Sequence, residues 1–237
     1  GDADAGVRAL GDSDAGVRAA ALGALDRCGR LDAPTLRAAL ADASPEVRRR
    51  AADLAASVDG TGIASALERA LDDDDPLVVE SACWALGERR AHAAVPYLSA
   101  VAAGHTDTRC REAAVAALGA VGRPEGLAAV LGALDDRPTV RRRATVALAA
   151  FSGGEVDEAL RRSAADRDWQ VREVAEILLD LDGGERDATP GIDGGVEEWT
   201  TEGWGAQEAG PPDPGGPPDT GGPPDPVPGA GTGPGDG

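Results

Sequence analysis

The sequence of 237 residues contains no Lys and no Met, and it has only one Tyr and one Phe. Aromatic residues make up 3% of the chain, so the bulky rings that fill many globular cores are scarce. Ala, Leu and Val supply most of the apolar side chains, and groups of this size suit thin helical layers that pack closely. The scarcity of aromatic residues therefore favours helices over a β-sandwich.

Other absences exclude further classes of protein. The three cysteines, Cys28, Cys83 and Cys110, have no close spacing, which predicts neither a disulfide framework nor a zinc site. The chain has no apolar run of about 18 residues, so we expect no transmembrane helix and no membrane partner. No signal peptide is recognisable, and we expect a cytoplasmic protein.

All 23 basic residues are Arg, and they stand against 42 Asp and Glu, which gives a net charge of −19. A surface this negative repels phosphate backbones, so nucleic acid is not an expected partner. Abundant acid without Lys is typical of halophilic proteins, since the Debye length falls to about 3 Å in molar salt. A GC-rich genome, which also replaces Lys with Arg, is the other explanation.

One sequence motif recurs through residues 1–182. It places a Val or Cys at intervals of 30 to 32 residues, at Val17, Val47, Val78, Cys110, Val140 and Val171. An Ala stands four residues after each of these positions and a Leu or Ala eight residues after it, which puts these side chains on one helix face. A good N-cap residue lies three positions before each of them, except at Arg137. Each copy is thus predicted to open a helix of about 12–14 residues.

Shorter apolar segments lie between these helices, at Asp32–Leu40, Ile63–Leu71, Ala94–Ala103, Pro124–Leu134 and Glu155–Ala164. A hairpin of two such helices cannot bury its apolar face alone and must stack on its neighbours. The predicted fold class is all-α: a right-handed α-solenoid of about six helical hairpins over residues 1–182. The first ten residues look like the stump of an earlier unit, so the N-terminal unit looks truncated.

A unit of about 31 residues with an Asp six positions before an Arg resembles the HEAT repeat, specifically its short PBS-lyase-like variant. The resemblance covers residues 1–182 and implies a ladder of Asp–Arg bridges between adjacent repeats. The matching residues are Asp12 with Arg18, Asp42 with Arg48, Asp135 with Arg141, and Asp166 with Arg172. Val79 replaces the Arg in one unit and His105 replaces the Asp in another. We expect the ladder to be interrupted there, which would soften the middle of the solenoid.

Few residues could support catalysis. The chain has two histidines, His92 and His105, and neither is followed by Glu. Deoxyhypusine hydroxylase, a HEAT-like enzyme, binds two irons through His-Glu pairs, and these are absent here. The acidic run Asp72–Asp75 lacks the spacing of an EF-hand and is interpreted as an N-cap cluster. We therefore expect no catalytic residue, no metal, no cofactor and no enzymatic activity.

The expected function is a scaffold or adaptor that binds another protein along one helix-lined surface. Positions two and six after each Val-type residue face away from the core, and they give Trp84, Val146, Ile177, Arg49, Arg142, Glu80, Glu112 and Glu173. Trp84 is the expected anchor. The alternative for these side chains is that they fill the space between helices and that each Arg neutralises nearby acid.

A second function also stays open. Similar repeats build bilin lyase subunits, so the resemblance allows an accessory or lyase-type subunit that acts on a protein-bound cofactor.

Residues 183–237 differ from the rest of the chain and hold 11 of the 17 Pro and 17 of the 33 Gly. Such a segment buries too little to fold, so we predict a disordered acidic tail. Trp199 and Trp204 are two large apolar residues in an otherwise apolar-poor segment. They are either a docking motif or part of a plain solubilising tail. We expect the solenoid to be monomeric.

Overall fold

The computed structural model describes residues 3–182, and the regular elements in this range are helices arranged in two layers. The A layer comprises α1 (Ala3–Ala9), α3 (Ala33–Ala39), α5 (Ile63–Ala70), α7 (Val95–Gly104), α9 (Leu127–Ala133) and α11 (Gly154–Ser163). The B layer comprises α2 (Ala15–Arg27), α4 (Pro45–Leu54), α6 (Pro76–Glu88), α8 (Thr108–Val121), α10 (Pro138–Ala147) and α12 (Trp169–Asp182). Short 3₁₀ turns occupy His92–Ala94, Pro124–Gly126 and Leu148–Ala150. The predicted tail, with Trp199 and Trp204, lies outside the described residues.

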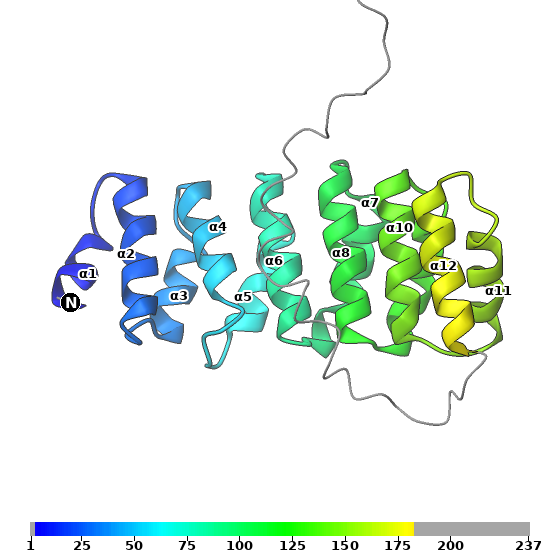
Figure 1. The fold of residues 1–237 in the computed structure, drawn as a ribbon. Helices are drawn as coiled ribbons and strands as arrows, with labels where there is room; N and C mark the ends of the chain where they lie inside the picture. Colours follow the sequence, from blue (N-terminus) through cyan, green and yellow to red (C-terminus); the bar gives the residue numbers. More distant parts are fainter. Residues whose placement is uncertain (1–2, 183–237) are drawn as a thin grey trace, which may run out of the picture. The chain divides into compact units, whose positions relative to one another are not determined.

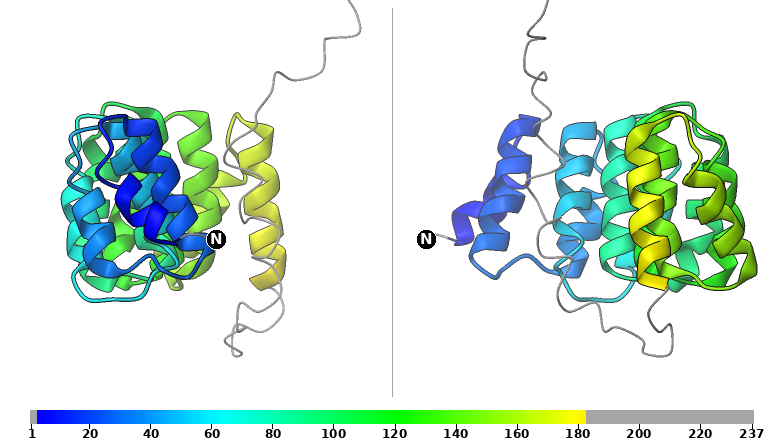
Figure 2. Two further views of the ribbon diagram at one scale, coloured as in Figure 1. Left: turned by 90° about the vertical axis from the view of Figure 1, so that its left-hand side faces the viewer. Right: turned by 45° about the vertical axis from the view of Figure 1, so that its right-hand side comes forward.

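Each A helix is followed by a B helix, and successive hairpins stack side by side. Figure 1 shows the B helices as a row in chain order, with the A helices behind them. The two further views in Figure 2 confirm that the layers are separate. Neighbouring B helices contact one another along the whole row, from α2 and α4 to α10 and α12. The described helices therefore form the α-solenoid that the repeat period predicts.

The B helices begin where the sequence predicts their N-caps. The Asp14 carboxylate accepts a hydrogen bond from the Val17 N–H at 3.1 Å, and Asp75 and Asp107 cap α6 and α8 in the same way at 2.8 Å. Pro follows the cap in α4, α6 and α10. The N–H that Pro lacks would have no acceptor within the helix at this position, so its absence costs nothing. These local signals fix the helix starts independently of packing.

Small side chains fill the space between the layers. The alanines four residues after the Val-type positions are all buried, and Ala51, Ala82 and Ala114 have no exposed surface. Leucines from both layers, such as Leu36 and Leu86, are equally buried and belong to the same continuous core. The apolar face predicted from the repeat is therefore the face that the hairpins bury against each other, except at Val17 in the first of the long B helices, which is 40% exposed.

Helix α4 is shorter than predicted, because it ends after ten residues at Leu54. The chain then forms a loop that carries Gly60 and Gly62, both at positive φ. The Arg89 side chain from the end of α6 donates to the backbone carbonyls of Ala55 and Val58, each at 2.8 Å. These bonds satisfy carbonyl groups that a longer α4 would have satisfied itself.

Two glycines let B helices approach one another closely. A Cβ on Gly87 would lie 3.0 Å from the Cα of Ala117, so α6 and α8 touch through backbone atoms. A Cβ on Gly119 would lie 2.9 Å from the Cβ of Ala147, and α8 and α10 meet in the same manner. Larger side chains at these positions would separate the helices.

We expect Gly119→Ala to destabilise the protein by about 1 kcal/mol, since overpacking outweighs the gain in helix propensity. The matched control is Gly132→Ala in α9, where a Cβ would meet nothing within 4 Å. That change should stabilise the protein by about 0.5–1 kcal/mol. Urea denaturation followed by circular dichroism measures both, and equal effects of the two changes would contradict the close contact.

Candidate protein interaction surface

A ladder of ion pairs runs along one edge of the B layer, where each B helix starts. In each rung, an Arg in the first turn of one B helix donates from Nε and Nη2 to both carboxylate oxygens of an Asp in the next hairpin. The rungs are Arg18–Asp42, Arg48–Asp73, Arg111–Asp136 and Arg141–Asp166, with donor–acceptor distances of 2.6–2.9 Å. The third nitrogen donates to backbone carbonyls of the Arg's own loop, as Arg48 does to Asp42 and Ala43. Each guanidinium thus joins two hairpins.

The bridges join adjacent repeats, as the resemblance implied, so each Arg pairs with an Asp of the next unit and not with the Asp six positions before it. Arg48 binds the carboxylate of Asp73 and reaches only the backbone of Asp42. Asp12 and Arg172 stand at the two ends of the ladder and form no rung within residues 3–182. The Asp12 carboxylate caps the Asp14 N–H instead, and Arg172 donates to the Asp166 carbonyl.

Asp136, and not the predicted Asp135, forms one rung, because Asp136 accepts the hydrogen bonds from Arg111. The loop before α10 has four residues, 134–137, where the loop before α4 has five, 40–44. The shorter loop moves the carboxylate by one position along the chain. A constant spacing from the Arg therefore locates the acid only where the loop length is constant.

Each ladder carboxylate also accepts a backbone N–H at the start of the following helix, as Asp136 does from Arg137 at 2.6 Å. The Arg111 guanidinium holds the pKa of Asp136 below its ordinary value of 3.8, although partial burial acts in the opposite direction. Asp42 and Asp166 show the same lowered pKa for the same reason. A lowered pKa means that the ionised carboxylate stabilises the fold above pH 3.8 and that this contribution is lost as the pH falls.

The neighbours Asp135 and Asp136 provide a direct test. At pH 7, Asp136→Asn should lower the free energy of unfolding by about 2 kcal/mol. This cost lies between that of breaking an exposed ion pair and that of breaking a buried one, because the pair is partly buried. Asp135→Asn removes the same charge from an exposed position and should change it by less than about 0.5 kcal/mol. The gap between wild type and Asp136→Asn should close as the pH falls from about 5 to below the pKa of the ladder carboxylates. Equal effects of the two changes would contradict the assigned rung.

Among the described residues, no ion pair joins α6 to α8. Val79 stands where the Arg would be and is fully buried, and His105 stands where the Asp would be. His105 Nδ1 accepts the hydrogen bond from the Asp107 N–H at 3.1 Å, which is the capping role of the missing carboxylate. Both departures from the repeat therefore fall on one joint, and one rung is missing rather than two.

Apolar contacts take the place of the missing rung. Cys83 and Cys110 are fully buried on the two helices, and the Cys110 thiol donates to the Pro76 carbonyl at 3.2 Å. Burial raises the pKa of Cys110 to about 12, so the thiol is protonated at neutral pH. Together with the contact at Gly87, this packing makes the joint close and apolar rather than open.

Restoring the rung tests whether the two positions act as a pair. We expect Val79→Arg and His105→Asp each to destabilise the protein by about 1–3 kcal/mol, because each introduces a charge without its partner. The double variant should recover about 1–2 kcal/mol of the sum. A double-mutant cycle from urea denaturation measures this coupling, and strictly additive effects would mean that the positions are unrelated.

The residues predicted to face a partner lie on B helices and differ in exposure. Val146 on α10 is 41% exposed and Ile177 on α12 is 55% exposed. Trp84 on α6 is only half-exposed, because its ring packs against the core. Of the charged members, two are exposed and three are half-buried: Arg49 and Glu173, then Glu80, Glu112 and Arg142.

Several of these charged groups bridge neighbouring helices. Arg142 donates to the Gln170 amide oxygen at 3.2 Å, and Arg143 donates to the Glu112 carboxylate at 3.5 Å. Burial raises the pKa of the Glu80 carboxyl, and the nearby Arg109 only partly offsets this. The basic residues of α10 therefore have partners within the B layer, whereas the Arg49 guanidinium makes no hydrogen bond or ion pair with the described residues.

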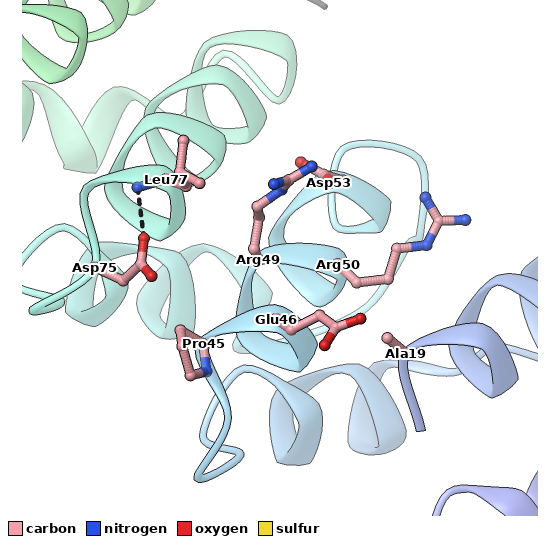
Figure 3. Close-up of a pocket in the computed structure, with 8 residues that line it drawn as sticks. All are labelled: Ala19, Pro45, Glu46, Arg49, Arg50, Asp53, Asp75 and Leu77. Carbon is pink, nitrogen blue, oxygen red and sulfur yellow. Dashed lines mark hydrogen bonds between the residues drawn. The ribbon is translucent and has the colours of Figure 1, made fainter. Parts of the chain in front are cut away.

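A hollow of about 540 Å³ opens on the B layer beside Arg49. Its lining comes from α2, α4, α6 and the cap before α6: Ala19, Pro45, Glu46, Arg49, Arg50, Asp53, Asp75 and Leu77. Figure 3 shows Arg49 and Arg50 on α4, with Leu77 on the side of Arg49 and the Arg50 side chain directed the other way, toward α2. The sequence pattern gave no sign of this hollow, since it depends on how three helices meet.

Exposed apolar residues also gather on the B layer. Of eight large apolar residues exposed within residues 3–182, six lie on B helices: Val17, Leu77, Val146, Trp169, Ile177 and Leu181. The other two are Val7 on α1 and Tyr97 on α7. The sequence reasoning identified Val146 and Ile177 but missed Leu77 and Trp169, which occupy the first turn of their helices. A search for apolar residues just after the N-cap would have found them.

The described residues offer no arrangement for a metal ion. In the range 3–182, no group of three or more His, Cys, Asp or Glu side chains converges in a way that suits a metal. Within the acidic run 72–75, Asp73 binds Arg48 and Asp75 caps α6. The helices of this range are also too short or too polar to span a lipid bilayer.

Comparison with known proteins agrees with the repeat geometry. A family model described as HEAT repeats matches residues 33–119 and 96–180. The chain belongs to the HEAT-repeat family. A comparison with curated proteins gave no match.

Solved structures with this fold include natural and designed solenoids. A designed armadillo repeat protein in complex with the peptide (KR)4 is similar to this HEAT-repeat chain, with a TM-score of 0.60 and 20% identity over 76% of this chain and 99% of the other. The complex of CpcE and CpcF of phycocyanin lyase from Nostoc sp. PCC7120 gives a TM-score of 0.56 and 23% identity over 73% of this chain and 74% of the other. At these identities the likeness establishes the fold alone.

Proposed function

We propose that this HEAT-repeat protein is a non-enzymatic scaffold that binds a partner protein along the outer surface of its B layer. The observation that carries the proposal is the concentration of exposed apolar side chains on B helices of a protein with a net charge of −19. Apolar groups surrounded by polar ones are typical of protein interfaces. Val146 and Ile177 would form the apolar part, with Trp84 contributing the exposed side of its ring.

The distribution of charge supports the same surface. In the described part of the chain, the twelve α-helices carry 16 Arg and 15 Asp and Glu, whereas the segments between them carry 6 Arg and 15 Asp and Glu. The negative charge is thus concentrated in the loops at the edges of the layers. A partner that lies across the helices meets a nearly neutral surface and avoids most of the repulsion.

The designed neighbour supports the proposal by analogy. Its structure holds the peptide (KR)4, so a solenoid of similar fold and length accommodates a peptide. A lyase-type accessory subunit is the second candidate, and the likeness to CpcE and CpcF favours it. Phycocyanobilin that is retained by the purified protein and transferred to an acceptor protein would support that candidate.

The scaffold proposal predicts that apolar side chains of the B layer contribute to partner binding. Peptides selected from a display library on the full chain should lose affinity by about tenfold or more with Ile177→Ala or Trp84→Ala. Tyr97→Ala is the matched control, because Tyr97 is 52% exposed but lies on α7 of the A layer. Fluorescence polarisation measures the affinities.

Trp84 also packs against the core, so thermal melts must show that its variant remains folded. Ile177 is 55% exposed, and its variant tests the surface with little effect on stability. Peptides that lose affinity with Tyr97→Ala but not with Ile177→Ala or Trp84→Ala would contradict the proposed surface.

A further inference from the structure

Helix α12 differs in charge from the other helices of the described range. It carries one Arg and four Asp and Glu, whereas the other eleven α-helices together carry 15 Arg and 11 Asp and Glu. Its single basic residue, Arg172, donates to two backbone carbonyls of its own loop. The carboxylates of Glu173, Glu176 and Asp180 make no hydrogen bond or ion pair within residues 3–182. This helix therefore presents negative charge that the described residues do not neutralise.

The exposed face of α12 combines these carboxylates with large apolar side chains. Seven residues of the helix are exposed, and each is either apolar or acidic: Trp169, Ile177 and Leu181, then Glu173, Glu176, Asp180 and Asp182. Ile177 and Leu181 lie one turn apart on the helix, and so do Glu176 and Asp180, which border them. The face is thus an apolar strip with carboxylates along it and no exposed basic group.

The open side of α12 is unsuited to another stacked hairpin. Figure 1 shows α12 as the last B helix of the described row. The residue five positions after the Val-type position is Glu176 in α12, and it is exposed. In the five preceding B helices this position holds an uncharged residue with no exposed surface: Leu22, Ala52, Cys83, Val115 and Thr145. A second copy stacked here in the register of the repeat would bury the Glu176 carboxylate, which is strongly unfavourable.

We propose that α12 binds an amphipathic helix of the partner protein whose apolar face is bordered by Lys or Arg. Apolar side chains of this helix pack on Ile177 and Leu181, and its basic side chains pair with Glu173, Glu176 and Asp180. The charges on the two sides are complementary, and apolar contact forms between them. This assignment names the chemistry of the partner and rests on the scaffold function proposed above.

The dimensions of the face suit a helix better than an extended strand. From Trp169 to Leu181 the face extends over about 18 Å, or about three helix turns. Apolar side chains one turn apart form a ridge that fits between the side chains of another helix. The ring of Trp169, which is 61% exposed, attracts a Lys or Arg cation at one end of the face. A bound strand would need backbone partners, and a helical surface provides none.

The test uses the full chain and a fluorescein-labelled peptide of about 14 residues, or about four helix turns. The peptide has Leu at the spacing of one helix face and Lys on both sides of that face. A second peptide has the same composition in scrambled order, so it keeps the charge and lacks the apolar face. Fluorescence polarisation should show binding of the amphipathic peptide that weakens as salt is added, because the exposed ion pairs are screened.

Two pairs of carboxylates provide matched variants. Glu173→Gln/Glu176→Gln should weaken binding of the amphipathic peptide about fivefold, through the loss of two exposed ion pairs. Glu155→Gln/Glu158→Gln removes two exposed carboxylates with the same spacing from α11 of the A layer and should leave the affinity unchanged. Ile177→Ala keeps the charge and should weaken binding about tenfold. All five side chains are exposed, and circular dichroism confirms that the variants stay folded.

Several outcomes overturn the proposal. One is equal affinity for the ordered and scrambled peptides, and another is an equal loss with the α11 control. A dimer in sedimentation equilibrium that Ile177→Ala dissociates shows that a second copy covers the face instead. Library-selected peptides that require Ile177 but tolerate Glu173→Gln/Glu176→Gln overturn the basic helix and leave the scaffold standing. If neither the library nor the amphipathic peptide gives binding, both proposals fail.

Discussion

At four of the five joints between the described hairpins, a guanidinium group that binds both oxygens of the next hairpin's carboxylate sets the position of one hairpin relative to the next. The Arg side chain also donates to the carbonyls of its own loop, so one residue fixes the loop, the start of the B helix and the spacing to the next unit. Partly buried ion pairs contribute little net stability, because desolvation offsets most of their attraction. Their effect here is on register. Stability comes from the continuous Ala, Val and Leu core that correct stacking creates.

The α6–α8 joint shows how the array holds together without this pair. Val79 and His105 replace the charged partners together, and fully buried apolar side chains and the Cys110 thiol then fill the joint. A lone Arg or a lone Asp at this position would leave an uncompensated charge, so the two replacements are physically linked. Close backbone contact at Gly87 completes the joint. The stack therefore continues through its centre with a different kind of contact.

The ladder also shapes the charge distribution of the B layer. It collects carboxylates in the loops at one edge and takes up one Arg from most B helices. Arg49 and Arg50 of α4 have no ion-pair partner among the described residues, and they line a hollow on the B layer together with Glu46, Asp53 and Leu77. The hollow follows from the stacking of three hairpins, so the same packing that builds the fold also shapes this surface.

The sequence alone determined the repeat period, the helix starts and the buried face, because caps, prolines and apolar spacing act within a few residues. Asp14, Asp75 and Asp107 cap their helices as expected, and Ala51 and Ala82 are buried as expected. Only the tertiary structure decided which carboxylate meets which guanidinium. Asp136 rather than Asp135 forms the rung, because a loop one residue shorter changes the register between hairpins. The average repeat spacing contains no information about the length of an individual loop. The half-buried position of Trp84 and the hollow at Arg50 are likewise products of contacts between helices distant in sequence, which no local pattern encodes.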